Sequence, residues 1–266
     1  MASDLVRTVD LRKTYRPRRW FGAIRTVVAL DGVSLSIPRG TTLALTGPSG
    51  SGKSTLGRCI AQLEDATSGE VWFDGQRVSG SGGRDLHSYR KQIQFIFQDA
   101  GTGLNPRFSA AEIVEEPLVI AGWNARDRRR RALEVMDHVQ LSPAWVDRRP
   151  CEFSGGQRQR LAIARALALN PKLLIFDESL SGVDVSIQAQ LVNLLLALQA
   201  SLCLTYLFIS HDLALIPYVA NEVAILNQGK IVKVCSMVDL YRYQTQRVVH
   251  PSSERITQSS AGVSAV

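Results

Sequence analysis

The chain has 266 residues, of which 45% are hydrophobic and 21% are charged. This composition supplies enough apolar material for one large domain, or for one domain with an insertion, and it excludes an intrinsically disordered chain. Lysine and arginine outnumber aspartate and glutamate by 31 to 24, and the net charge of +7 suits nucleic acid, an anionic membrane surface or a polyphosphate ligand without choosing among them.

The N-terminal part is predicted to be rich in β-strands. Residues 1–15 mix charged and apolar side chains and lack the unbroken apolar core of a secretory signal, so we expect the protein to stay in the cytoplasm. Short β-like runs occupy residues 5–11, 27–30, 33–37, 41–46 and 70–73, and turns such as Asp31-Gly32 and Asp74-Gly75 separate them. These runs predict an antiparallel sheet that leads into a central strand.

Helical periodicity replaces the strands in the middle of the chain. Ser109 is suited to cap a helix over residues 110–121, and a second amphipathic stretch covers residues 125–139. Further on, helices over residues 161–169 and 187–200 alternate with strands over residues 173–176 and 206–209, as in a parallel α/β layer. We therefore expect a helical insertion between two halves of one sheet.

The other sequence features argue against a membrane span, a zinc site and an ordered C-terminus. Residues 185–210 contain no Asp, Glu, Lys or Arg and exceed the ~20 residues that a span needs, but polar residues between the leucines favour a soluble helix and a strand. The four cysteines (Cys59, Cys151, Cys203 and Cys235) are far apart and predict buried or idle thiols. From residue 236 the chain becomes rich in serine, so we expect a poorly ordered tail.

A glycine-rich loop joins the predicted strand at residues 41–46 to a helix-compatible run at residues 56–63, and it matches the pattern G-x-x-x-x-G-K-[ST]. Its residues are Gly47, Pro48, Ser49, Gly50, Ser51, Gly52, Lys53, Ser54 and Thr55. Glycines let the main chain wrap a phosphate closely, Lys53 would contact the β- and γ-phosphates, and the Ser54 hydroxyl would ligate Mg²⁺. Thr55 is assigned to the α-phosphate side. The flanking strand and helix favour this interpretation over an ordinary glycine-rich turn.

Two carboxylates end the predicted strand at residues 173–176. Asp177 and Glu178 would be costly to bury unless a cation or a reacting water uses them. We therefore assign Asp177 to Mg²⁺ and Glu178 to the role of general base. Alone, an Asp-Glu pair is equally consistent with two acids that merely terminate a strand, and the phosphate loop upstream favours the catalytic interpretation.

A second predicted anion cradle precedes this strand. Residues 153–160 read Phe-Ser-Gly-Gly-Gln-Arg-Gln-Arg, and Ser154, Gly155, Gly156 and Gln157 stand at the start of a helix. Together with the phosphate loop and the Asp-Glu strand, this stretch resembles the signature of the ABC transporter ATPase family. The resemblance covers about residues 5–234 and implies that the cradle holds the ATP of an opposite subunit.

The resemblance assigns four more residues. It implies that Gln98 senses Mg²⁺ and the attacking water, that Asp184 communicates across the dimer interface, and that His211 contacts the γ-phosphate. Tyr15 stands where the family carries an aromatic residue that stacks on adenine. Judged singly, a histidine after a strand is more often structural, and His211 gains its role from its place in the series.

The resemblance also implies the fold and its divisions. We expect an α/β protein with a P-loop NTPase (RecA-like) core, an N-terminal antiparallel β-subdomain and an inserted α-helical subdomain. The ATPase domain would cover residues 1–235, the helical subdomain about residues 99–153, and a short tail residues 236–266.

Further stretches resemble the branch that imports oligopeptides, dipeptides and nickel: Trp20-Phe21-Gly22, Leu104-Asn105-Pro106-Arg107, and residues 184–190. This implies a peripheral subunit on the cytoplasmic face of a bacterial inner membrane. Its partners would be a second ATPase subunit, two transmembrane permeases and, indirectly, an extracytoplasmic solute-binding protein; no nucleic acid is expected. Many peptide-type members continue past the His211 region with a longer C-terminal segment, whereas this chain has only His250-Pro251 and a serine-rich remnant there. This difference favours a nickel-type system.

Some residues depart from the family pattern or lie outside it. Gly182 stands where the family usually has alanine, and Ser179 directly follows the assigned base Glu178. The helix from Ile187 lacks the charges expected on its exposed side. An arginine run (Arg126, Arg128, Arg129, Arg130 and Arg131) could meet anionic lipid or RNA, but such runs are mostly solvated faces, which is the interpretation we adopt.

Three alternative functions compete with that of an importer subunit. An exporter subunit fits the ATPase motifs equally well. A soluble ABC ATPase acting on ribosomes or DNA usually has two cassettes or a long coiled-coil insert, and this chain has neither. A regulatory partner with impaired hydrolysis would lack a key residue, whereas Lys53, Asp177, Glu178 and His211 are all present.

Overall fold

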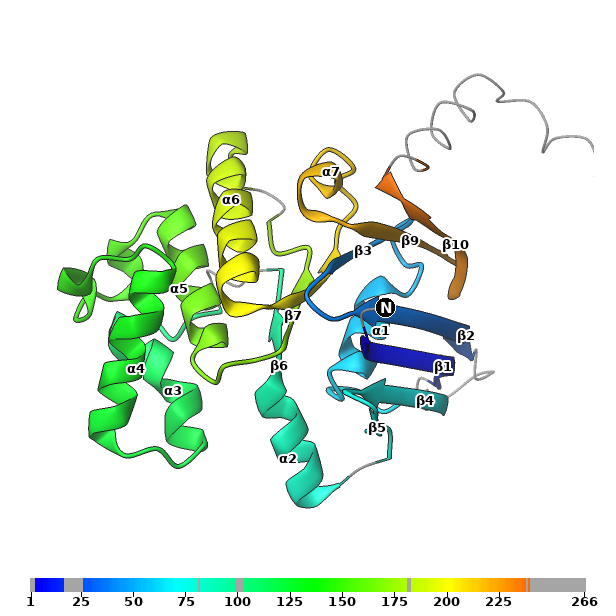
Figure 1. Ribbon diagram of the computed structural model, residues 1–266, viewed down its shortest axis with the longest axis horizontal. Coiled ribbons are helices and arrows are strands. Elements are labelled where there is room, and N and C mark those ends of the chain that lie inside the picture. The colour runs from blue at the N-terminus through cyan, green and yellow to red at the C-terminus, as the bar shows by residue number, and fades with distance from the viewer. Residues whose placement is uncertain are drawn as a thin grey trace, which may run out of the picture.

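Two β-sheets and the helices around them form the protein (Figure 1). The computed structural model describes residues 3–16, 26–80, 82–98, 103–180, 183–237 and 239. Several predicted features lie outside this part of the chain: the stretch Trp20-Phe21-Gly22, Gly182 beside Glu178, the proposed start of the insertion at residue 99, and most of the C-terminal tail.

The first sheet is antiparallel and is built from the N-terminal part of the chain. Its strands, in spatial order, are β2 (Val27–Pro38), β1 (Asp4–Tyr15), β4 (Ser68–Phe73) and β5 (Gln76–Arg77). The predicted turn at Asp31-Gly32 is wrong, because β2 runs through these residues. The register with β1 shifts there instead, and Gly32 adopts a φ of 75°. An Asp-Gly pair can therefore mark an irregularity within a long strand as well as a turn between two strands.

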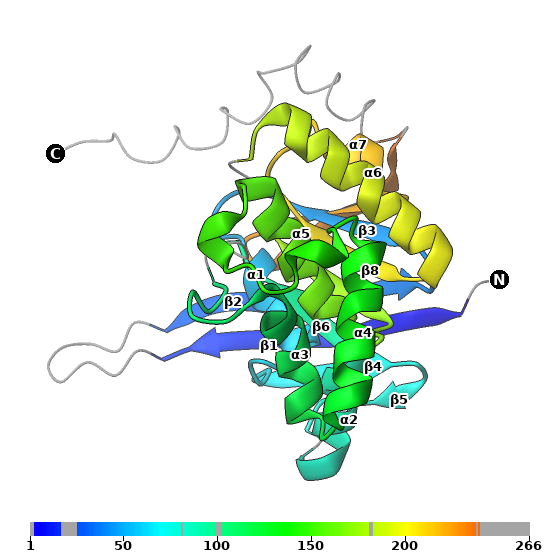
Figure 2. The same cartoon turned by 90° about the vertical axis from the view of Figure 1, so that its left-hand side faces the viewer.

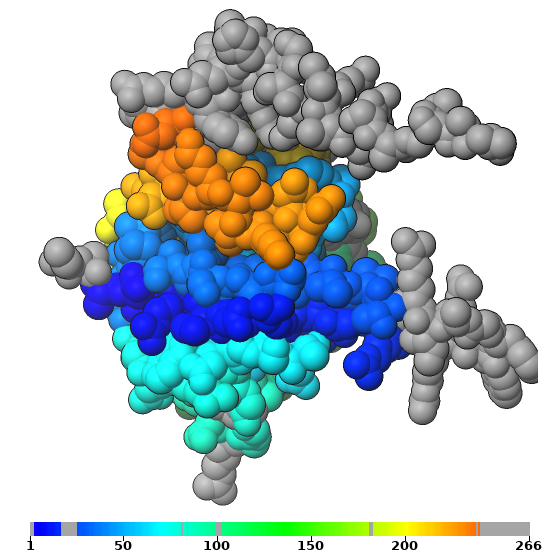
Figure 3. All heavy atoms as spheres, turned by 90° about the vertical axis from the view of Figure 1, so that its right-hand side faces the viewer, coloured from blue at the N-terminus to red at the C-terminus, as the bar shows by residue number. Residues whose placement is uncertain are grey.

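The second sheet contains both halves of the chain that flank the helical insertion. Its strands, in spatial order, are β10 (Lys230–Ser236), β9 (Glu222–Asn227), β3 (Thr42–Thr46), β8 (Thr205–Ile209), β7 (Leu173–Asp177) and β6 (Ile93–Ile96). All neighbours are parallel except β9 and β10. The prediction of one sheet across the insertion is confirmed, because β6 pairs with β7. Figure 3 shows the outer face, where β10 lies above the N-terminal strands.

Every residue of β3, β7 and β8 is buried, as expected for central strands of a parallel sheet covered on both faces. The helix α1 (Lys53–Ile60) follows β3 and packs between the two sheets, where Leu56 and Ile60 contribute to a shared core. The carboxyl ends of β3, β7 and β8 meet at one edge of the second sheet. In open α/β sheets this edge is where ligands bind.

The other helices lie outside the sheets. They are α2 (Gly83–Gln92), α3 (Ala110–Ile120), α4 (Ala125–His138), α5 (Gly155–Leu167), α6 (Val185–Leu202) and α7 (Ile216–Val219), with 3₁₀ turns at Pro143–Trp145 and Pro150–Glu152. The predicted cap is confirmed: Ser109 accepts from the Glu112 amide, and the Glu112 carboxylate binds the Ser109 amide in return. Figure 2 shows α3 and α4 side by side at the front. Sequence patterns did not reveal α2, α7, β9 or β10.

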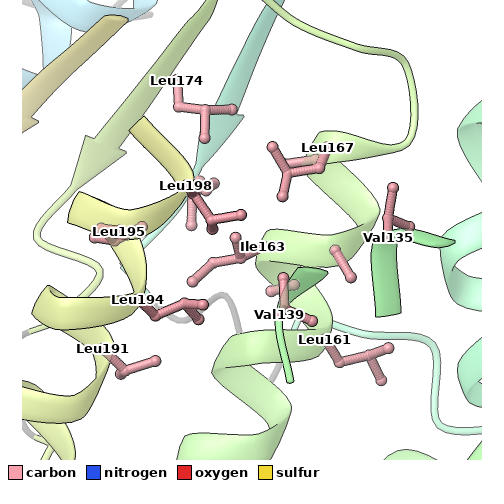
Figure 4. Packing of buried hydrophobic residues seen from close by; sticks show 14 of the residues in the cluster. Val135, Val139, Leu161, Ile163, Leu167, Leu174, Leu191, Leu194, Leu195 and Leu198 are labelled. Carbon is pink, nitrogen blue, oxygen red and sulfur yellow. The ribbon is translucent and has the colours of Figure 1, made fainter. Parts of the chain in front are cut away.

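A second core joins the inserted helices to the sheet. Figure 4 shows Val135 of α4, Val139 just after α4, Ile163 of α5 and Leu198 of α6 in one cluster, which also includes Leu174 of β7. The helix α6 is long and apolar enough to cross a membrane by length and composition. Leu191, Leu194, Leu195 and Leu198 are nevertheless part of this core, so the interpretation as a helix of the folded domain holds.

The arginine run on α4 is only partly a solvated face. The Arg130 side chain is 76% exposed, as expected, but Arg131 is buried. Arg131 donates from Nε to the Ala168 carbonyl at 3.2 Å and from Nη2 to the Leu167 carbonyl at 2.9 Å. It therefore adds charged donors to the carbonyls at the end of α5, one of which, that of Leu167, also accepts from the Asn170 amide at 3.0 Å. The interpretation as a solvated face is wrong for Arg131, because sequence alone did not show that α5 ends against this side of α4.

Replacing Arg131 by methionine should lower the free energy of unfolding by about 2–3 kcal/mol, because buried carbonyls of α5 lose charged donors. Urea denaturation would measure the loss. Arg130→Met is the matched control and should change stability by less than about 0.5 kcal/mol, because its pairing with Asp127 is exposed. Equal effects of the two substitutions would contradict the capping role.

Candidate functional site

The glycine-rich loop connects β3 to α1 and lies tightly between the two sheets. Gly47 has a φ of 149°, and a Cβ there would lie 2.0 Å from the Leu226 carbonyl oxygen in β9. Gly52 has a φ of 107°, and a Cβ there would lie 2.3 Å from the Ala29 carbonyl oxygen in β2. Any side chain at either position would push the loop away from its neighbours. These two glycines therefore fix where the loop is held.

The loop encloses a positive charge and a hydroxyl. Lys53 is 5% exposed, and its Nζ donates to the carbonyls of Gly47 and Pro48, each at 3.0 Å. Within the described residues no carboxylate forms an ion pair with Lys53, so its charge is available to an anion. The Ser51 hydroxyl is buried and has no hydrogen-bond partner among the residues that the structure describes. A buried cation and an unpartnered buried hydroxyl in the same loop fit a phosphate group.

Ser54 and Asp177, which the sequence predicted to share a metal ion, lie together. The Ser54 hydroxyl donates to Oδ1 of Asp177 at 2.8 Å, and Asp177 is 6% exposed. Burial raises the pKa of the Asp177 carboxyl, while the hydrogen bond from Ser54 acts in the opposite direction. A hydroxyl and a carboxylate are ligands that suit Mg²⁺, which usually completes its coordination with water and substrate phosphates. Accordingly, the described ranges contain no group of three His, Cys, Asp or Glu residues that could hold a metal alone.

Glu178 and His211 follow adjacent strands and are in contact. Oε1 of Glu178 lies 3.2 Å from Nδ1 of His211; the side chains are 22% and 57% exposed, respectively. The main chain of Glu178 has a φ of 50°, which is uncommon for a residue other than glycine, and its amide donates to the Ile209 carbonyl at 3.0 Å. An uncommon backbone conformation next to a buried acid is typical of functional sites.

Gln98 and Tyr15 lie on either side of this centre. Ile96 pairs with Phe176 in the parallel sheet, and Gln98 and Glu178 each lie two residues beyond this pair. They therefore leave the sheet at the same edge. Gln98 is exposed there. Tyr15 ends β1; its hydroxyl donates to Glu64, just beyond α1, and the Lys13 ammonium lies 5.1 Å from the ring centroid. Partial burial raises the pKa of Tyr15.

Glu64 is a residue of this site that the sequence did not reveal. Besides Tyr15, it pairs with Arg58 at 3.3 Å and with Lys13 at 3.9 Å. It thus ties the end of β1 to the helix behind the phosphate loop. No motif contains Glu64, and its three partners lie in two separate elements, so only the fold brings them together.

The second predicted anion cradle lies at the start of α5, beside α4 and away from α1 (Figure 1). The Ser154 amide donates to the Gln157 side chain at 2.9 Å, and the Ser154 hydroxyl accepts from the Gln157 amide at 3.3 Å. Ser154 and Gly155 are exposed, and a Cβ on Gly155 would meet nothing within 4 Å. Gly156 is packed: a Cβ there would lie 2.7 Å from Cγ2 of Ile187 in α6. The cradle therefore opens outward, not toward the phosphate loop of its own chain.

Asp184 occupies the N-cap position of α6 and is exposed, like Val185 after it, which is 80% exposed. The structure thus divides the predicted residues into two sets. Lys53, Ser54, Asp177, Glu178 and His211 gather at one sheet edge. The signature residues and Asp184 lie at the starts of two helices on the surface.

Ser179, which departs from the family pattern, is buried, and its hydroxyl has no hydrogen-bond partner within the described residues. All four cysteines are free; Cys59 and Cys235 are buried, and Cys151 and Cys203 are exposed. Burial raises the pKa of the Cys59 thiol to about 11. The expectation of burial therefore holds for Cys59 and Cys235, and that Cys151 and Cys203 are idle stays a prediction.

The known proteins that resemble this chain in sequence agree with one another in family. The family model described as ABC transporter matches residues 30–181. The chain is 46% identical over 240 residues to a putative peptide import ATP-binding protein of Brucella ovis, covering 90% of this chain and 74% of that protein. It is 44% identical over 235 residues to the dipeptide transport ATP-binding protein DppF of Escherichia coli, covering 88% and 70%.

Solved structures agree with this similarity. The dimeric post-hydrolysis state of the ATP-binding cassette MJ0796, bound to ADP and Pi, matches with a TM-score of 0.76 and 31% identity, over 87% of this chain and 98% of that chain. The structure of cbiO1 from Clostridium perfringens has a TM-score of 0.78 over 95% of this chain and 97% of that chain; at 24% identity it supports the fold alone. The predicted fold class, a P-loop NTPase core with an antiparallel β-subdomain and helical parts, is confirmed.

Two adjacent glycines of the outward cradle should respond differently to alanine. Gly155→Ala should leave the free energy of unfolding unchanged or slightly higher, because the new methyl group meets nothing and alanine favours a helix. Gly156→Ala should lower it by about 1–3 kcal/mol, because the methyl group would overlap Ile187. Thermal denaturation of both variants would check this. Equal loss at Gly155 would mean that the cradle is closed by its own chain.

Proposed function

The chain belongs to the ABC transporter family of ATP-hydrolysing subunits, and we propose that it supplies the energy for peptide uptake by an importer. ATP would bind the loop at residues 47–55, with Tyr15 against the adenine and Lys53 on the β- and γ-phosphates. Support comes from the buried Lys53 ammonium and the unpartnered Ser51 hydroxyl. Thr55, at the first turn of α1, would lie on the α-phosphate side of the same nucleotide.

Ser54, Asp177 and Gln98 would hold Mg²⁺. When bound with ATP, this ion neutralises charge on the β- and γ-phosphate oxygens. The chain's own part of the chemistry lies with Glu178 and His211. Glu178 would accept the proton of the water that attacks the γ-phosphorus, while the bond to the oxygen of the departing ADP breaks. His211, in contact with Glu178 at 3.2 Å, would orient that carboxylate and reach the γ-phosphate.

The observation that carries the proposal is the outward direction of the second cradle. Ser154 and Gly155 are exposed at the start of α5, and Gln157 fixes Ser154 through the reciprocal cap. A helix N-terminus with free amides suits a phosphate, and nothing in this chain's own phosphate loop reaches it. Two such chains, or this chain and a sister ATPase, would therefore each complete the other's ATP site, with Asp184 at the contact.

The permease partners would bind a groove beside the end of β6. This groove has a volume of about 210 Å³, and its lining includes Phe97, Glu116, Ile120 and Arg165. Phe97 is 52% exposed and Ile120 71% exposed. Two large exposed apolar side chains at a groove near Gln98 suit an inserted protein segment. The subunit would accordingly be peripheral, on the cytoplasmic face of an inner membrane, with cargo received from a solute-binding protein.

Peptides are the cargo favoured by the names of the relatives, whereas the short C-terminal segment had favoured a nickel-type system. Nickel, or another solute, is therefore an outcome for the transport experiment to decide.

Glu178→Gln should retain ATP binding and lower the hydrolysis rate at saturating ATP by at least about 100-fold, because the amide cannot accept the proton. Lys53→Ala should weaken ATP binding itself. Nucleotide binding and phosphate release, measured on purified protein, separate the two effects. Asp147→Asn, at a carboxylate whose side chain is 89% exposed, is the control and should behave as wild type. Wild-type hydrolysis by Glu178→Gln would remove Glu178 as the general base.

The same variant tests the paired site. Glu178→Gln with ATP and Mg²⁺ should associate into a dimer, alone or with its sister subunit, and adding Gly155→Ala should abolish that association without unfolding the chain. Light scattering would follow both. Dimers that persist with Gly155→Ala would contradict a phosphate bound at this cradle.

Tagged Glu178→Gln, captured from its native membranes with ATP, should retain multi-pass permeases and a second ATPase. Ile120→Asp should lose the permeases, whereas Val232→Asp, at a side chain that is 57% exposed on β10, should keep them. Uptake of labelled dipeptides against labelled nickel by the intact system then identifies the cargo. Capture of ribosomal or DNA-repair proteins without any permease would overturn the transport proposal.

A further inference from the structure

The main chain just after Glu178 is held by two buried glutamine side chains. Gln159 donates from Nε2 to the Ser179 carbonyl at 2.9 Å, and Gln188 donates from Nε2 to the Leu180 carbonyl at 2.9 Å. Gln159 is 4% exposed and Gln188 is 8% exposed. Two consecutive peptide groups downstream of the catalytic carboxylate therefore each receive one hydrogen bond from a different helix.

These two bonds hold the carbonyls of Ser179 and Leu180. The Ser179 side chain adds no further bond, because its buried hydroxyl has no partner within the described residues. Glu178 itself adopts the uncommon φ of 50°, and such a conformation persists only where its surroundings determine it. Upstream, the Glu178 amide is fixed by the Ile209 carbonyl. Downstream, Gln159 and Gln188 fix the main chain through the carbonyls of Ser179 and Leu180.

The two helices that carry these glutamines begin at the surface that faces the proposed partner. Gln159 lies five residues after Ser154 on α5, a rise of about 7 Å along the helix. Gln188 lies four residues after Asp184 on α6, slightly more than one helical turn. The two helices touch where Gly156 meets Ile187. A displacement of either helix start would therefore be passed to the peptide groups beside Glu178.

We propose that Gln159 and Gln188 are positioning residues that couple the two helix starts to the backbone of Glu178. A phosphate bound by Ser154 and Gly155 would set the position of α5, and Gln159 would transmit it to the Glu178 of the same chain. Each chain's catalytic carboxylate would thereby respond to nucleotide bound in the opposite site. The inference rests on the proposed function, in which the cradle of one chain binds the ATP of the other.

Gln159→Met keeps the length of the side chain and removes the donor. It should lower kcat for ATP hydrolysis about tenfold or more while KM for ATP changes less than twofold, because the phosphate loop is untouched. Gln188→Met should act in the same direction. Gln62→Met is the matched control: Gln62 is also buried and donates to a main-chain carbonyl, that of Cys59 at 2.8 Å, far along the chain from Glu178. It should lose similar stability and keep the wild-type kcat.

A double-mutant cycle separates positioning from a general loss of stability. If Gln159 acts through Glu178, then Gln159→Met should have little further effect on single-turnover hydrolysis in a Glu178→Gln background. Independent, multiplicative effects of the two substitutions would overturn the inference, as would a wild-type kcat for Gln159→Met or an equal fall of kcat in Gln62→Met. Wild-type protein without any ATP hydrolysis would instead refute the proposed function.

Discussion

The site depends above all on the parallel pairing of β3, β8, β7 and β6. Parallel strands present their carboxyl ends at one edge, so residues that follow these strands meet although they are far apart in sequence. The register makes this specific: Asp177 pairs with Ile209, which places Glu178 and His211 next to each other. A shift of one strand by one residue would separate the acid from the histidine and Asp177 from Ser54.

Burial then gives the gathered residues their chemical character. Lys53 and Asp177 are both nearly inaccessible to water, and each is held by local hydrogen bonds, not by a direct ion pair with the other in the described structure. Charges in such an environment interact strongly with a phosphate or a metal ion, because little solvent screens them. The glycines at positions 47 and 52 make this possible by letting the loop approach β9 and β2 closely.

The sequence was most informative where chemistry restricts the choice of residue. Lys53, Ser54, Asp177 and Glu178 could be assigned because phosphate and Mg²⁺ require such groups at fixed spacing, and the Ser109 cap because it depends on residues three apart. Expectations failed where the partner is distant: Arg131 looked like one of a solvated run, and Asp31-Gly32 looked like a turn. Local patterns do not show that α5 ends against α4 or that β1 pairs with β2 along this stretch. Glu64 and Gln188 were missed for the same reason. The predicted domain boundaries and the residue roles stay predictions.

If the ATP site is shared between two chains, as proposed, hydrolysis by a lone chain should be inefficient. The phosphate loop and Glu178 lie at the sheet edge, but the second cradle faces outward from α5, so one chain offers only part of a closed phosphate site. The helices that limit the mobility of the Glu178 backbone are the same helices whose N-termini would meet the partner. If those ends are not held, the carboxylate samples positions that do not favour attack, and a small displacement is enough to slow the reaction greatly. Dimerisation would thus add both a phosphate ligand and a constraint on the base.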